Sequence, residues 1–457
     1  MKILFCIYQL DFADHISLSY LSAIAKNRGH ETYFTLLESF EESLKNTNPD
    51  IVAYSLNIFG MNEIIENHKK IKEKYSFKSI AGGPGVTFNS DAYKDSQIDV
   101  FCIGEGEYAF DEYLSKMEKG ESVDNILNLI TKNNKNIVRP WIKNLDTLPF
   151  PDRDITLANS YLKDTPKKTF YATRGCPFSC YYCANNYYNE LYKGKGKIIR
   201  RFSPERLIEE IKYVGSRYRM DFVKFGDDLF ALKADDWLRK FSELYKKEIN
   251  IPFNCFLRFD TVTDELLQLL KDCNCYSVHL SVDSTSEHVR EKILGRKMRK
   301  VNIEENLKLI HSYGIKTWVN FMLAAPDSTL EDDLSTIELS YKSNVTYAAY
   351  ATTVPMKGTK LYDYVMEHGL INEEYISDMI GCTQKSMLNS LSEKEKNIRY
   401  NIYLVGPLIS KFPNPFRQIA IFIIKHTKPN KLYILIRKLY YTYNIENVIF
   451  KLDKTRK

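Results

Sequence analysis

Residues Tyr171–Asn186 read YATRGCPFSCYYCANN and carry three cysteines, Cys176, Cys180 and Cys183, at the spacing C-x3-C-x2-C. The apolar run that leads into them, KTFYATR, predicts a strand, so the cysteines stand in a loop directly after it. Structural zinc normally has four ligands, often as two separated pairs, and no histidine lies near this loop. Because the next cysteine is as far away as Cys255, the spacing favours an iron–sulfur cluster with one iron free of protein ligands. A zinc site and three incidental cysteines are the alternatives.

The bulk composition is that of a soluble, globular protein. Apolar residues make up 44% of the 457 residues and charged residues 27%, both close to globular averages. The first apolar run ends at Asp11 and predicts a strand instead of an export signal. No run approaches the roughly 18 apolar residues of a membrane-spanning helix. We therefore expect a cytoplasmic protein whose cysteines serve metal binding or catalysis before disulfides.

Residues 1–140 alternate short β-rich runs with helical periods. The runs predicted as strands are 2–8, 31–37, 50–56, 77–83 and 98–104, with helices near 17–27, near 40–46 and after the third strand. This alternation predicts a Rossmann-like, doubly wound α/β module whose ligand binds at the carboxyl ends of the strands. The dinucleotide motif G-x-G-x-x-G is missing after the first strand, so we expect neither a nicotinamide nor a flavin dinucleotide.

A Pro-rich linker, residues 141–165, precedes a second β/α series over residues 166–370. The predicted strands are 168–174, 221–226, 253–258, 276–283, 316–323 and 346–353. Six β/α units over roughly 200 residues suit a partial (β/α)6 barrel of the TIM type, in which chemistry lies at the carboxyl ends of the strands. Residues 371–457 show helical periods and predict a mostly helical C-terminal region.

The cysteine loop CPFSCYYC resembles the signature of the radical S-adenosylmethionine (SAM) superfamily. In that family SAM binds the open iron of a [4Fe-4S] cluster, and one electron cleaves it to methionine and a 5′-deoxyadenosyl radical that abstracts hydrogen from a substrate. The resemblance implies that Cys176, Cys180 and Cys183 hold the cluster and that the backbone of Tyr182 meets the adenine. It also implies an external electron donor such as flavodoxin or ferredoxin.

Polar residues after the next three predicted strands resemble the family's SAM-binding positions. In FGDDLF, Asp227 or Asp228 would accept a hydrogen bond from the SAM ammonium group. Arg258 in CFLRFD would bind the SAM carboxylate, because a guanidinium fork suits a carboxylate. Asp283 in SVDSTS stands where the family has a glutamate and would contact the ribose or another part of the ligand. Strand-end caps and surface ion pairs are the alternative for all of them.

A later segment, LAAPDST, departs from the family pattern G-x-P-G-E-T that it resembles. Ala324, Asp327 and Ser328 stand where the pattern has two glycines and a glutamate. We therefore expect that a loop contact usual in relatives is missing here.

The first module resembles that of cobalamin-dependent radical SAM enzymes. GGPGVTF at 82–88 and IGEGEYAF at 103–110 are similar to their GGP-x-x-T and GEGE-x-x-F segments. The resemblance implies a cobalamin site. The residues implied are Ser55, Gly82, Gly83, Pro84, Gly104 and Glu105. The motif D-x-H-x-x-G, which donates a histidine to cobalt, is missing because Asp14 and His15 are adjacent, so we expect cobalt without a histidine ligand. The alternative is that the glycines serve tight turns of a module that binds no cofactor.

These cofactors together imply methylation of an unactivated carbon in a small-molecule, lipid or natural-product substrate. Enzymes of this kind also catalyse oxidation, cyclisation and rearrangement, which the motifs do not separate. A non-catalytic cobalamin or iron–sulfur sensor is a further alternative. Methylthiolation of tRNA is not expected, because it needs another cysteine trio and only Cys6 and Cys102 precede the loop.

The basic charge is concentrated at the C-terminal end. From Lys411 to Lys457 there are eleven Lys and Arg residues against two acids, in a chain of net charge +6. Between Phe412 and Tyr443 these alternate with apolar residues, and basic amphipathic segments can lie in a membrane interface. Peripheral membrane contact and a lipid-linked substrate are one interpretation, and a helical cap on the barrel is the other. We expect no nucleic acid, because no known binding module accompanies the basic residues.

Overall fold

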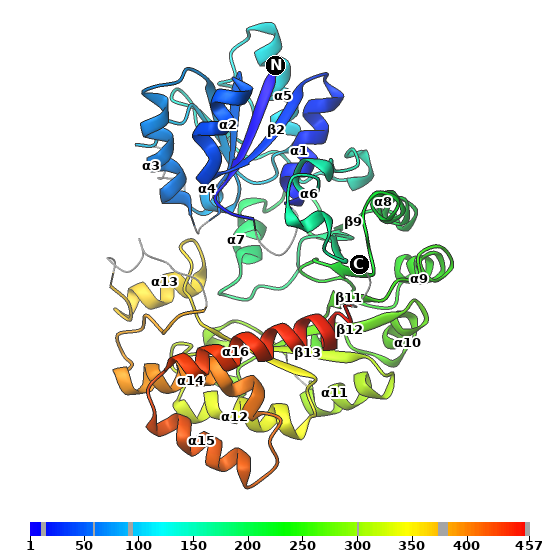
Figure 1. Ribbon diagram of the computed structural model, residues 1–457, viewed down its shortest axis with the longest axis vertical. Coiled ribbons are helices and arrows are strands. Elements are labelled where there is room, and N and C mark those ends of the chain that lie inside the picture. Colours follow the sequence, from blue (N-terminus) through cyan, green and yellow to red (C-terminus); the bar gives the residue numbers. More distant parts are fainter. Residues whose placement is uncertain (11–14, 58–59, 90–94, 299–300, 373–382, 453–457) are drawn as a thin grey trace. The chain divides into compact units, whose positions relative to one another are not determined.

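The computed structural model describes residues 1–10, 15–57, 60–89, 95–298, 301–372 and 383–452 (Figure 1). They form two compact units. Unit 1 comprises Met1–Thr165, Tyr187–Phe202 and Ser216–Arg219, and unit 2 comprises Pro166–Asn186, Ser203–Gly215 and Met220–Lys457.

Unit 1 is built on a six-stranded sheet of order β2-β1-β3-β4-β5-β6, parallel except for β6. Its strands are β1 (Lys2–Ile7), β2 (Glu31–Leu36), β3 (Ile51–Ser55), β4 (Lys78–Gly82), β5 (Val100–Cys102) and β6 (Leu129–Ile130). Its helices include α1 (Ile16–Asn27), α2 (Phe40–Thr47), α3 (Met61–Lys72), α4 (Pro84–Phe88) and α5 (Glu107–Lys119). This confirms the predicted doubly wound module.

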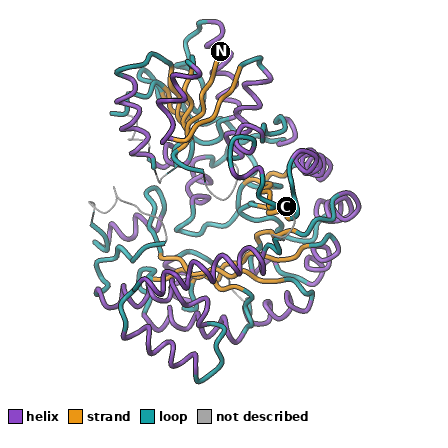
Figure 2. The backbone as a smooth tube through the Cα atoms, viewed as in Figure 1, coloured by secondary structure: helices purple, strands orange, loops and turns teal. Residues whose placement is uncertain are grey.

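Strand β1, which lies between β2 and β3, shows why both faces of this sheet carry helices (Figure 2). Leu4 and Cys6 belong to a core with residues of α2 and α3, whereas Ile3, Phe5 and Ile7 belong to a second core with residues of α1 and α5. Successive side chains of a strand point to opposite faces, so a continuous apolar run requires cover on both sides.

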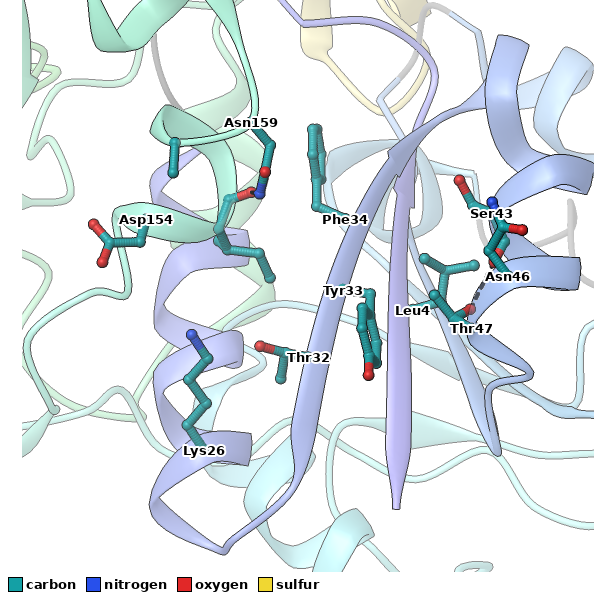
Figure 3. Close-up of a pocket in the computed structure, with 12 residues that line it drawn as sticks. Leu4, Lys26, Thr32, Tyr33, Phe34, Ser43, Asn46, Thr47, Asp154 and Asn159 are labelled. Atoms are coloured by element: carbon teal, nitrogen blue, oxygen red, sulfur yellow. Dashed lines mark hydrogen bonds between the residues drawn. The ribbon is translucent and has the colours of Figure 1, made fainter.

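The segment 141–165, predicted as a linker, packs within unit 1. Ile142, Leu145 and Leu148 are buried beside Tyr20 of α1, and the Asp152 carboxylate accepts from the Ser22 hydroxyl of α1 at 2.6 Å. The structure thus differs from the predicted boundary, because apolar residues between the prolines fix the segment to the module. Next to its short helix α6 (Asp154–Leu157), the β2 edge borders a hollow of about 430 Å³ (Figure 3).

Unit 2 contains a second six-stranded sheet, wholly parallel, in the order β14-β13-β12-β11-β10-β7. Its strands are β7 (Lys167–Phe170), β10 (Phe222–Phe225), β11 (Phe253–Phe256), β12 (Cys275–Asp283), β13 (Lys316–Leu323) and β14 (Tyr347–Thr352). Its helices include α8 (Pro204–Arg217), α9 (Asp236–Glu248), α10 (Asp264–Asp272), α11 (Ile303–Ser312), α12 (Leu330–Lys342) and α13 (Lys360–Glu367). Neighbouring strands follow each other along the chain, as the predicted partial (β/α)6 barrel requires.

Most of the unit 2 helices begin after a residue whose side chain accepts a hydrogen bond from the backbone three positions later. They include Asp235, Thr263, Asn302, Thr329, Thr359, Ser392 and Asn430. Each satisfies one of the unpaired N–H groups of a first helical turn, so local sequence sets where the helices start.

The C-terminal region is helical, as predicted, with α14 (Glu393–Ile409), α15 (Phe416–His426), α16 (Lys431–Tyr443) and a π-helical turn (Asn444–Ile449). Helix α14 packs on β14, and α15 and α16 pack on α14. Ile449 and Phe450 then bury against Phe222 and Tyr347, the first residues of β10 and β14. Among the helices that the structure describes, none is long and apolar enough to cross a membrane.

Candidate cluster and cofactor sites

The three cysteines of the predicted cluster lie in one loop between β8 (Thr173–Arg174) and α7 (Ala184–Leu191). The loop is folded on itself, because the Cys183 N–H donates to the Cys180 carbonyl at 3.2 Å. The Asn185 amide donates to the Cys183 sulfur at 3.7 Å. Cys180 is buried, whereas Cys176 and Cys183 are half-buried, so a ligand can reach the loop.

Burial and a nearby negative charge favour the protonated form of the loop cysteines until a metal binds them. Burial, with a smaller contribution from the Asp228 charge, raises the pKa of the Cys176 thiol and raises that of Cys183 to about 11. These thiols need bound iron to lose their protons near neutral pH. Among the described residues no three His, Cys, Asp or Glu side chains gather around a single ion. A [4Fe-4S] cluster does not need that arrangement, since each thiolate binds a different iron, and the three cysteines fit it.

The structure separates the two neighbouring aspartates that follow β10. Asp227 is buried, and its Oδ1 accepts from the Thr173 backbone N–H at 2.5 Å and from the Thr173 hydroxyl at 2.9 Å. Burial raises the pKa of Asp227 to about 7. Asp228 is exposed, and its carboxylate interacts with Asn185 and with the charges of the cysteine loop. Asp227 therefore anchors the strand before the loop, and Asp228 is the carboxylate that a ligand can reach.

Arg258, which was predicted to bind the SAM carboxylate, lies beside the cysteine loop. Its guanidinium already forms an ion pair with Asp260. Its Nε and Nη2 donate to the two oxygens of Asp260, both at 2.8 Å. Its Nη1 is 3.8 Å from the Cys180 sulfur, and its guanidinium lies 3.6 Å from the ring centre of Phe178. A carboxylate ligand would have to share this guanidinium with Asp260, and the SAM role of Arg258 stays a prediction.

Asp283 and Tyr182, predicted for different parts of SAM, are joined through Arg296. The Tyr182 hydroxyl donates to Asp283 Oδ2 at 2.6 Å. Arg296 Nε lies 3.3 Å from the same oxygen, and Arg296 Nη1 donates to the Tyr182 hydroxyl at 3.3 Å. Asp283 also has a left-handed backbone, with φ of 65°. These contacts hold the side chain of Tyr182, the residue before Cys183, in place. The contacts of Tyr182 and Asp283 with SAM remain predictions. Sequence reasoning missed Arg296, since nothing in the local pattern LGRK distinguishes it.

Polar residues also occupy the sheet face opposite α9. His279 stacks between Phe256 and Trp318, with both pairs of ring centres 4.2 Å apart. Burial lowers the pKa of His279 to about 3, so the ring is neutral. Lys224 was not predicted. Its pKa is lowered to about 8 by burial and by the charge of Lys167.

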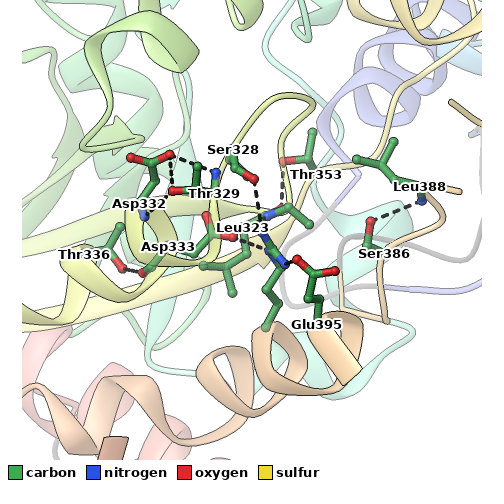
Figure 4. A network of polar contacts seen from close by, with 12 residues as sticks. Leu323, Ser328, Thr329, Asp332, Asp333, Thr336, Thr353, Ser386, Leu388 and Glu395 are labelled. Atoms are coloured by element: carbon green, nitrogen blue, oxygen red, sulfur yellow. Dashed lines mark hydrogen bonds and ion pairs between the residues drawn. The ribbon is translucent and has the colours of Figure 1, made fainter. Parts of the chain in front are cut away.

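The loop LAAPDST, which departs from the family pattern, has left-handed backbone conformations that glycine usually adopts, although it contains no glycine. Ala324 and Asp327 have φ of 56° and 62°, in the left-handed region. Asp333 Oδ2 accepts from the Ala324 N–H at 3.1 Å and from Arg399 Nε of α14 at 2.6 Å (Figure 4). Arg399 also donates to the Ser328 carbonyl at 3.1 Å. A buried ion pair thus holds the loop in shape.

The predicted cobalamin residues converge at one edge of the unit 1 sheet. β3 and β4 pair so that Ser55 lies opposite Gly82, and β5, the next strand, ends two residues before Gly104. The Gly104 N–H donates to the Thr87 hydroxyl at 3.1 Å. The residues concerned are half-buried: Ser55, Gly82, Gly83, Pro84, Gly104 and Glu105. Short side chains and reachable backbone fit a large, flat cofactor at the carboxyl ends of the strands.

Gly104 and Glu105 also contact other residues of unit 1. Gly104 has φ of 73°, and a Cβ there would lie 2.0 Å from the Tyr192 hydroxyl. The Glu105 carboxylate pairs with Arg200 at 2.7 and 3.0 Å and accepts from the Ile142 N–H at 3.1 Å. Gly104 and Glu105 therefore hold unit 1 together, whatever they contribute to cobalamin.

A histidine that sequence reasoning set aside lies at the same edge. The His15 Nε2 is 3.4 Å from the Ser55 hydroxyl, and its Nδ1 is 3.2 Å from the Ser17 hydroxyl. The missing D-x-H-x-x-G motif gave no reason to place it there. The closeness of His15 and Ser55 becomes visible only when β1 and β3 are paired.

Comparison with known families supports both sites. Residues 170–339 match the family described as the Radical SAM superfamily, and residues 12–114 match the B12 binding domain. The two matches confirm the predicted combination: the chain carries a radical SAM domain preceded by a B12-binding domain, and its cofactors are a [4Fe-4S] cluster, SAM and cobalamin. The zinc and cofactor-free alternatives are thereby set aside.

Individual proteins resemble the chain over most of its length. An uncharacterised methyltransferase of Pyrococcus horikoshii is 27% identical over 338 residues, 72% of each protein. The bacteriochlorophyllide d C-8(2)-methyltransferase of Chlorobaculum tepidum is 23% identical over 301 residues, 65% of this chain and 64% of that one. The structure of TsrM from Kitasatospora setae with cobalamin and a [4Fe-4S] cluster has a TM-score of 0.66 and 13% identity, covering 80% of this chain and 75% of TsrM. This last likeness shows the fold.

Proposed function

We propose that the protein transfers a methyl group from SAM to an unactivated carbon of a small-molecule, lipid or natural-product substrate. The observation that carries the proposal is the combination, in one chain, of the cysteine loop and a B12-binding domain whose predicted ligand residues share one sheet edge. When bound, the cluster supplies the electron that cleaves SAM, and cobalamin carries the methyl group. The names of two relatives as methyltransferases support this reaction class.

The residues of the chain would bind and orient SAM. Cys176, Cys180 and Cys183 would hold three irons and leave the fourth open. The exposed Asp228 would accept a hydrogen bond from the SAM ammonium, since a charged pair gives the stronger bond. The Asp283 contact would fix Tyr182, whose backbone would meet the adenine. An external one-electron donor such as flavodoxin or ferredoxin would reduce the enzyme.

The test uses SAM with a deuterated methyl group and no substrate. The anaerobically reconstituted protein is loaded with hydroxocobalamin and reduced, and both the recovered cobalamin and the small products are analysed by mass spectrometry. We expect a deuterated methyl group on the cobalamin and slow release of 5′-deoxyadenosine. 5′-Deoxyadenosine without label on the cobalamin would contradict methyl transfer and favour oxidation, cyclisation or rearrangement. The matched control, Cys180→Ala, should still bind cobalamin but release no 5′-deoxyadenosine.

A further inference from the structure

Helix α15 leaves large apolar side chains exposed on one side. Phe416, Ile419 and Ile423 follow each other at helical spacing and are 63%, 52% and 45% exposed. Ile421 and Ile424 on the other side are buried. The helix therefore packs on α14 through one apolar side and presents a second apolar side outward.

Helix α16 repeats this arrangement. Leu432, Leu435, Leu439 and Tyr443 are spaced by three and four residues and form one stripe, with exposed fractions of 62%, 51%, 63% and 61%. No residue of α16 is fully buried. Isolated exposed apolar residues are normal in soluble proteins, but stripes on two successive helices mark an interaction surface.

The charge of these helices has one sign. From Lys411 to Asn444 the chain has seven Lys and Arg residues and no Asp or Glu. Arg417 pairs with Glu338 at 2.8 Å, Arg437 donates to the Tyr403 carbonyl at 2.8 Å, and Lys411 donates to the Val345 carbonyl.

The four remaining basic residues are placed differently. Lys425, Lys428, Lys431 and Lys438 form no ion pair with a described residue, and the last three are exposed. Their ammonium groups can therefore meet a negative partner outside the chain.

We propose that α15 and α16 dock on the surface of an anionic lipid bilayer. The apolar stripes would enter the boundary between head groups and acyl chains, while the lysines contact the anionic head groups. The helices have 11 and 13 residues, too few for the roughly 20 needed to span a bilayer, so the contact is peripheral. A second copy of the chain fits this surface less well, because two faces of the same positive charge repel each other.

This docking does not depend on the proposed methyl transfer. The residues of α15 and α16 belong to neither the cluster loop nor the cobalamin edge. Loss of vesicle binding and loss of SAM cleavage can therefore be measured separately on the same preparation.

The experiment is flotation of the full-length, reconstituted protein with vesicles. Vesicles of phosphatidylcholine alone are compared with vesicles that also contain phosphatidylglycerol, at low and at high salt. One variant replaces three leucines of the α16 stripe with serine (L432S, L435S and L439S). Another replaces three lysines with glutamate and so reverses their charge (K428E, K431E and K438E). The matched control makes the same charge change at exposed lysines of α9 and α11 (K246E, K247E and K308E).

We expect the wild type and the control to float with anionic vesicles at low salt, with weaker binding at high salt. Each α16-region variant should bind at least about tenfold more weakly, because the lysine variant loses the attraction of three basic residues to the head groups and the leucine variant loses apolar burial. Unchanged iron content and SAM cleavage establish that the variants fold. Equal flotation of wild type and variants, or no flotation of the wild type at low salt, would overturn the proposal. Self-association without lipid that the leucine variant abolishes would assign the surface to a second copy instead.

Discussion

The cysteine loop of unit 2 and the glycine-rich edge of unit 1 use their motif residues in different ways. In the loop, Cys176 and Cys183 are half-buried thiols whose burial disfavours their charged form until a metal binds. At the edge, Gly104 leaves space for the Tyr192 hydroxyl, and Glu105 pairs with Arg200. The comparison indicates that one motif leaves its side chains accessible for the predicted cofactor, whereas the other also serves internal packing. Substitutions should therefore remove a cofactor in the first region and stability in the second.

The largest effect should follow from changes in the loop. Cys176→Ala, Cys180→Ala or Cys183→Ala should each abolish the four-iron cluster, because a missing thiolate leaves a second iron without a protein ligand. Iron analysis and 5′-deoxyadenosine release after anaerobic reconstitution measure the loss. Cys273→Ala, outside the loop and buried, should keep its iron. Four iron atoms per chain in any loop variant would contradict the assignment.

At the edge, Gly104→Ala should destabilise unit 1 by about 2 kcal/mol or more, because the left-handed backbone and the Tyr192 hydroxyl both oppose a Cβ. Thermal unfolding measures the change. Adding Tyr192→Phe should restore part of the stability, since it removes the nearest atom. A Gly104→Ala protein as stable as the wild type would break the contrast between the two regions.

The two aspartates after β10 allow the same contrast within one site. Asp228→Asn should weaken SAM binding by about ten- to a hundredfold, since a hydrogen bond between charged groups contributes about 1.5–3 kcal/mol, and should leave stability unchanged. Asp227→Asn should instead lower the melting temperature, because it disturbs the bonds to Thr173. Equilibrium binding of SAM and thermal melts distinguish the two. Equal loss of SAM affinity in both variants would argue against this division of roles.

The smallest effect is expected for His15→Ala. If cobalt binds without a protein histidine, this substitution should leave the visible spectrum of bound cobalamin unchanged. The affinity for cobalamin should fall only slightly, because the substitution removes the contact between His15 and Ser55. Titration with hydroxocobalamin under anaerobic conditions measures both. A shifted spectrum in the variant would identify His15 as a cobalt ligand and refute the prediction made from the missing motif.

Local patterns predicted the two sheets well. Alternating apolar runs placed the strands within a few residues, because side-chain period and turn residues act over short distances. The three cysteines could be recognised as a group for the same reason, since they lie within eight residues of sequence, and their role as cluster ligands stays a prediction. Short helices next to the motifs, α4 after Gly83 and α7 after Cys183, were missed because glycine and cysteine patterns mask their helical period.

Contacts over long sequence separations could not be predicted. Arg200 reaches Glu105 over 95 residues, and Arg296 reaches Tyr182 over 114. Nothing near these arginines distinguishes them from surface residues. The C-terminal helices show a related limit. The spacing of apolar residues predicted amphipathic helices, but it did not predict which apolar residues are buried. Ile421 is buried, whereas Phe422 is 63% exposed.

Iron and cobalt analysis of one preparation tests most directly whether this chain holds both cofactors at separate sites. The protein is reconstituted anaerobically with iron, sulfide and hydroxocobalamin, desalted, and analysed for both metals beside the Cys180→Ala variant. We predict four iron atoms and one cobalt atom per wild-type chain, and cobalt without the cluster in the variant. A wild type with four iron atoms and no cobalt would contradict the account, as would a variant that loses cobalt together with iron.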